Sequence, residues 1–116
     1  MSNFAIIKSK NIIQNLKSSV PEFFANADVD HNDPPYYILA RFADFLIKGI
    51  EEEELPKDVI NRAFSFINSA FASTDTSAMD AISISIFETF SEHPKCIELC
   101  NKLLSDRARQ SLIETL

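Results

Sequence analysis

The chain contains a single glycine, Gly49, among its 116 residues. Glycine is the residue that most readily adopts positive φ, and hairpin turns and phosphate-binding loops depend on that conformation. β-Sandwiches, hairpin-rich folds and glycine-cradled phosphate sites are therefore poorly compatible with this sequence. Hydrophobic residues make up 46% of the chain, which is too many for a disordered protein. We expect an all-α fold, and the length fits one helical domain over residues 1–116.

Prolines mark most of the expected helix boundaries, because proline disfavours helical backbone at the residue before it and is tolerated at the first helical position. Between these boundaries, apolar residues recur at three- and four-residue steps, which predicts helices with one buried face. We expect five or six helices, packed as antiparallel hairpins around a phenylalanine-rich core. The expected helical ranges are 4–18, a short segment from residue 21, 36–50, 56–71, 79–90, 94–104 and a short last segment from residue 106.

One stretch, residues 81–87, alternates apolar and polar side chains and would also suit a β-strand. However, Met79, Ile82, Ile86 and Phe90 share one helical face, and an isolated strand would have no partner in this chain. We therefore predict a helix here, because packing overrides the modest helix penalty of β-branched residues.

Two similar tetrapeptides, Pro56-Lys57-x-Val59 and Pro94-Lys95-x-Ile97, each open the second helix of an expected pair. Their separation is close to the length of a two-helix solenoid repeat, which indicates a short HEAT-like helical repeat. An irregular helical bundle explains the same pattern.

Two motifs contain residue types that bind metals. Asp28-x-Asp30-x-Asn32 matches the start of a calcium-binding loop, but Asp33 stands where glycine is needed and Leu39 where a closing glutamate is needed. We interpret it as an acidic surface loop. His93-x-x-Cys96-x-x-x-Cys100 offers three zinc ligands, but the cysteines lie on the apolar stripe of their helix. We interpret them as small buried side chains and expect no metal and no cofactor.

The sequence contains no clear catalytic arrangement. Glu22 could pair with Asp28 or Asp30 as an acid and base, but nothing in the sequence fixes their separation, and we expect no enzymatic activity. The amino terminus lacks the apolar run of a secretory signal, and no stretch approaches the length of a membrane span. We therefore expect a cytoplasmic protein with reduced cysteines and no membrane contact.

The formal net charge of −6 argues against a nucleic-acid partner, because excess positive charge is needed to displace counterions from phosphates. Gly49 precedes the run Glu51–Glu54 by two positions, and we expect this glycine to be the flexible point of the turn. The run is either a solvated turn or a patch that docks a basic protein. A second candidate contact surface combines tyrosines with the acidic loop, although tyrosines there could simply pack the first helical turn. Its residues are Tyr36, Tyr37, Asp28, Asp30 and Asp33.

Residues 36–104 resemble a family of small bacterial helical domains that are interpreted as immunity proteins of polymorphic toxin systems. The resemblance rests on Tyr37-Ile38-Leu39…Phe42-x-x-Phe45-Leu46, Ile60-Asn61-Arg62-Ala63-Phe64-Ser65-Phe66-Ile67-Asn68 and Ile82…Phe87-Glu88-x-Phe90. It implies a non-enzymatic protein that binds and neutralises a cognate toxin, and no binding residue is carried over from it. With the acidic composition, it leads us to expect a basic toxin domain as the partner. The alternatives are a helical-repeat adaptor that binds a peptide or helix, and a small metal-dependent protein.

Overall fold

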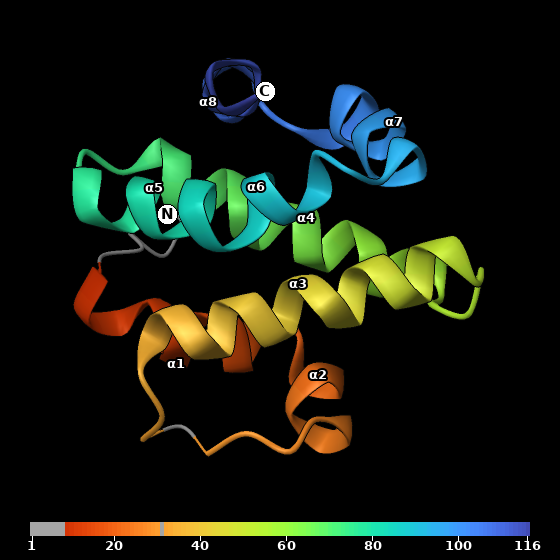
Figure 1. Cartoon of the computed structure of the whole chain (residues 1–116). Coiled ribbons are helices and arrows are strands. Elements are labelled where there is room, and N and C mark those ends of the chain that lie inside the picture. Colours follow the sequence, from red (N-terminus) through yellow and green to blue (C-terminus); the bar gives the residue numbers. More distant parts are fainter. Residues whose placement is uncertain (1–8, 31) are drawn as a thin grey trace, which may run out of the picture.

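The computed structural model describes residues 9–30 and 32–116, and these residues form only helices and their connections (Figure 1). The all-α prediction is confirmed. The start of the first predicted helix, residues 4–8, lies outside the described residues. The elements in chain order are η1 (Ser9–Asn11), α1 (Ile12–Ser19), α2 (Pro21–Asn26), α3 (Pro35–Glu51), α4 (Lys57–Ala72), α5 (Thr76–Ile82), η2 (Ser83–Phe87), α6 (Glu88–Phe90), α7 (Pro94–Leu103) and α8 (Asp106–Thr115).

All five prolines lie at helix beginnings, as expected from the sequence. Pro21, Pro35 and Pro94 are the first residues of α2, α3 and α7, where the missing N–H group costs no intrahelical hydrogen bond. Pro34 and Pro56 immediately precede α3 and α4. Two other helices are capped by side chains: Asp75 accepts hydrogen bonds from the first turn of α5, and Ser105 from that of α8.

The alternating stretch 81–87 is helical, as predicted, but its last five residues form a π-helix, η2, which the sequence did not predict. Together, α5, η2 and α6 make one continuous helix. Ser85, Ile86 and Phe87 are all buried while Ile84 is exposed, because the wider π turn directs three consecutive side chains inward.

The helices form three layers (Figure 1). The first contains α1, α2 and α3, the second contains α4 and the α5–η2–α6 helix, and the third contains α7 and α8. α3 and α4 run in opposite directions, but α3 packs mainly against η2 and α7, whereas α4 packs mainly against α1, α5 and α8. The buried side chains join all three layers in one core, which is rich in phenylalanine as predicted. Six phenylalanines have almost no exposed surface: Phe23, Phe42, Phe64, Phe66, Phe87 and Phe90.

No helix in the described part of the chain is long and apolar enough to cross a membrane.

Candidate functional site

The predicted contact residues fall into two groups at opposite ends of α3. The acidic loop precedes the helix, and the glutamate run begins at its last residue, Glu51. α3 has 17 residues, so the two ends are about 25 Å apart at 1.5 Å per residue. Tyr36 and Tyr37 lie in the first turn of α3, beside the loop, with 49% and 47% of their surface exposed. The structure therefore brings the tyrosines to the loop but keeps the glutamates apart from both.

The acidic loop is held by two of its own carboxylates. Asp30 Oδ1 accepts a hydrogen bond from the backbone N–H of Asn32 at 2.9 Å, and Asp33 Oδ2 accepts one from the N–H of Asp30 at 2.9 Å. Such bonds are typical of a self-supporting polar turn. Asp28 is exposed, and its carboxylate has no hydrogen bond to any described residue. Within residues 9–30 and 32–116, no group of acidic, histidine and cysteine side chains could hold a metal ion.

Glu51 connects α3 to α7. Its Oε1 lies 2.7 Å from Nδ1 of His93, and its backbone carbonyl accepts a hydrogen bond from Lys95 Nζ at 3.3 Å. Of the four glutamates, only Glu52, Glu53 and Glu54 have carboxylates without an ion pair to the described residues. We therefore assign Glu51 to the fold and the other three to the exposed acidic surface.

The turn after α3 corrects our expectation for Gly49. Gly49 is a buried residue of α3, two positions before the last residue of the helix, and its φ is not positive. A Cβ atom placed on it would lie 2.2 Å from Cγ of Leu55, so the residue is small because Leu55 packs against the helix there. The left-handed backbone position is Glu53, with φ 53°. After Glu53 the chain turns back towards the last turn of α3, where the N–H of Glu54 donates a hydrogen bond to the carbonyl of Gly49 at 2.9 Å.

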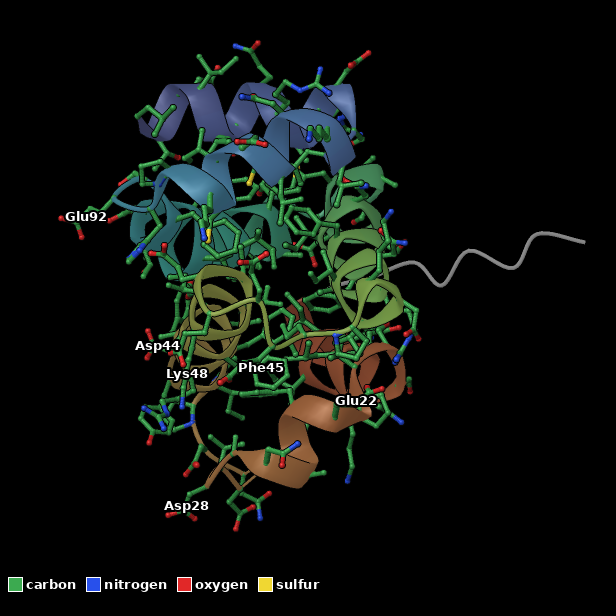
Figure 2. The ribbon with its side chains drawn as sticks, turned by 90° about the vertical axis from the view of Figure 1, so that its right-hand side faces the viewer. Glu22, Asp28, Asp44, Phe45, Lys48 and Glu92 are labelled. Carbon is green, nitrogen blue, oxygen red and sulfur yellow. The ribbon has the colours of Figure 1, made fainter. Side chains whose placement is uncertain are left out.

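A groove of ≈ 600 Å³ separates α2 from the outer face of α3. Phe23, Phe45 and Leu55 contribute apolar surface, and α3 supplies Asp44 and Lys48. Figure 2 shows Asp44 and Lys48 together on one edge of the molecule, above Asp28, while Phe45 lies between α3 and α2. Our sequence reasoning missed this groove, because Phe45 belongs to the predicted apolar face of α3 and only the position of α2 makes it a groove residue.

Glu22 is paired with Arg62 of α4, and not with Asp28 or Asp30. Arg62 Nη1 donates a hydrogen bond to Glu22 Oε1 at 2.9 Å, and Arg62 Nη2 donates one to Glu22 Oε2 at 2.5 Å. Nη1 also donates to the carbonyl of Ser19, and Nη2 to Asp58. The hydrogen bonds from Arg62 are the main cause that lowers the pKa of Glu22 to about 2. These residues connect α2 to α4 electrostatically, and they do not form an acid–base couple.

Cys96 and Cys100 are fully buried and free. Burial raises the pKa of Cys96 to about 11, with a further contribution from Glu51, and that of Cys100 to about 12, with a further contribution from Cys96. Both residues are therefore neutral thiols near pH 7, and their surroundings match the interpretation as small apolar side chains. His93 is hydrogen-bonded to Glu51 across the helix ends.

A family described as a domain of unknown function, DUF7674, matches residues 13–115. No curated protein and no solved structure matches significantly.

Proposed function

The chain belongs to the DUF7674 family, a domain of unknown function, and we propose that it is a non-enzymatic protein that binds a basic protein partner through both ends of α3. More specifically, we propose an immunity protein that neutralises a cognate bacterial toxin. One observation carries the proposal: exposed carboxylates without ion pairs to described residues lie at both ends of a helix that also exposes two tyrosines.

The electrostatics favour a basic partner. Glu52, Glu53, Glu54 and Asp28 extend into solvent from a chain of net charge −6. Carboxylates that are not already neutralised attract a positively charged surface over several ångströms and raise the rate of association. The active-site cleft of a nucleic-acid-degrading toxin is a surface of that kind, because it has to attract phosphates.

Tyr36 and Tyr37 would supply the anchoring contacts. Tyrosine combines a large apolar ring with a hydroxyl group and loses little conformational entropy on binding, so it is common among the residues that dominate binding energy. In such a complex, this protein would cover the cleft of the toxin with the acidic ends of α3. It would insert the rings of Tyr36 and Tyr37 at the border of the cleft.

The groups with shifted pKa values offer no support for catalysis. Among the described residues, the carboxyl group with the strongly lowered pKa, that of Glu22, is held by Arg62, and the two cysteines with raised pKa values are buried in the core. Each of these shifts has a structural cause, which favours an interaction protein over a hydrolase.

Co-expression tests the proposal. The chain is expressed with the product of each gene that neighbours its own, and for a cognate toxin both co-purification and restored growth of the host are expected. The variant Tyr36→Ala/Tyr37→Ala should weaken both, whereas Ile84→Ala, which removes an equally exposed apolar side chain on η2, should not. Absence of co-purification together with absence of growth rescue would contradict the proposal.

The α2–α3 groove supports a second candidate, an adaptor that binds a peptide. Its apolar floor would contribute binding energy that depends little on salt, unlike the charged ends of α3. An adaptor of this kind would lose its peptide on Phe45→Ser and keep it on charge reversal of Glu52 and Glu53, which do not line this groove. The opposite result would favour the toxin-directed function.

A further inference from the structure

A different groove lies between α4 and α7, on the side of the molecule where α3 turns into α4. Its volume is ≈ 510 Å³. The similar tetrapeptides Pro56-Lys57-x-Val59 and Pro94-Lys95-x-Ile97 lie at the beginnings of these two helices. A groove between two helices can hold the apolar face of a third helix. In Figure 2 this side faces the viewer.

The floor of the groove is aliphatic. Ile60 comes from α4, Leu99 and Leu103 come from α7, and Leu55 comes from the preceding turn. All four are only partly buried, although each packs against the core. Leu99 and Leu103 are four residues apart, so they lie on one face of α7, about one turn from each other. This spacing suits the apolar stripe of another helix.

The two walls of the groove are basic. Lys57 stands on the α4 wall, and its ammonium group has no ion pair to any described residue. Lys102 stands on the α7 wall and makes an exposed contact of 3.4 Å with Glu98 of the same helix. Such exposed pairs contribute little and exchange readily with another carboxylate. One carboxylate, Glu53, lines the groove against these two lysines. This local excess of positive charge contrasts with the acidity of the whole chain.

We propose that the α4–α7 groove binds an amphipathic helix of a protein partner whose apolar face is aliphatic and whose flanks are acidic. The aliphatic face would cover Ile60, Leu99 and Leu103, and glutamates on its two sides would pair with Lys57 and Lys102. This surface adjoins the carboxyl end of α3 and shares Glu53 with the acidic run there, but its two lysines select a partner of the opposite charge. It does not depend on the function proposed above.

The test uses a synthetic helical peptide with a leucine face and glutamate flanks, and a matched peptide with lysine at every glutamate position. Methyl NMR titration of the full chain with the glutamate peptide should shift the resonances of Ile60, Leu99 and Leu103, and the lysine peptide should bind more weakly. The variant Lys57→Glu/Lys102→Glu should lower the affinity for the glutamate peptide by about tenfold or more. Lys57 and Lys102 are exposed, so this double variant keeps the core intact.

The control is Lys10→Glu/Lys17→Glu, which makes the same change in net charge on η1 and α1. It should bind the glutamate peptide like the unmodified chain. The proposal is overturned if neither peptide binds, if both bind equally well, if the shifted methyl groups lie outside the groove, or if the control variant weakens binding as much as the groove variant.

Discussion

Individual backbone positions in the turn after α3 determine how tightly this turn can close. Glu53 occupies the left-handed region at φ 53°, which costs a residue with a side chain about 1 kcal/mol. Glu53→Gly should therefore raise the free energy of unfolding by about 1 kcal/mol in urea denaturation. Glu52, at φ −92°, supplies the control, because Glu52→Gly should bring no gain. Equal effects of the two substitutions would show that the turn is not strained at Glu53.

Gly49 limits the packing of Leu55 in the same turn. Gly49→Ala adds about 1 kcal/mol of helix propensity, but its Cβ would lie 2.2 Å from Leu55 Cγ and 2.4 Å from Cδ1. Overpacking of this kind costs about 1–3 kcal/mol, so the variant should be less stable in urea denaturation. In the double variant with Leu55→Ala, part of that cost should disappear. Strictly additive effects of the two substitutions would contradict the close contact as the reason for glycine.

At the scale of elements, the contact of α2 with α4 should depend on pH. The pKa of Glu22 is about 2 in the folded chain, against an ordinary value of 4.5. A lowered carboxyl pKa stabilises the fold fully above the unfolded pKa, and the stabilisation is lost as the pH falls from about 4.5 towards 2. The difference in unfolding free energy between the wild type and Glu22→Gln should therefore shrink over this range. Urea titrations at several pH values measure it, with the exposed Glu88→Gln as baseline. A difference that stays constant with pH would contradict the pairing.

The elements also show what a sequence can and cannot predict here. The prolines and the apolar spacing located the helices, because both act within a few residues. The π-helix could not be predicted, since the burial of Ser85, Ile86 and Phe87 depends on α3 and α8 packing against the same turn. For the same reason, the role of Gly49 was misjudged and the contact of Glu51 with His93 was not predicted. They depend on Leu55 and on His93, which only the folded chain brings to them.

At the scale of the whole molecule, the exposed acidic groups are widely distributed. They stand at the two ends of α3 and also on other helices, for example at Asp80 and Glu114, whereas the α4–α7 groove carries Lys57 and Lys102 on its two walls beside one carboxylate, Glu53. The two lysines of the groove could not be placed together from the sequence, because net charge is a property of composition and not of position on the surface. Among the described residues, three of the nine proposed contact residues use their carboxylates in contacts within the chain: Glu51, Asp30 and Asp33.

The affinity of the toxin domain for charge-reversed variants, measured over a range of ionic strength, tests the proposed function most directly. Glu52→Lys/Glu54→Lys should weaken binding by about tenfold or more and flatten its salt dependence, because the variant removes the attracting carboxylates. Asp80→Lys/Glu114→Lys makes the same charge change on α5 and α8 and should bind like the wild type. Wild-type affinity and salt dependence in the first variant would contradict the acidic surface at the end of α3 as the binding site.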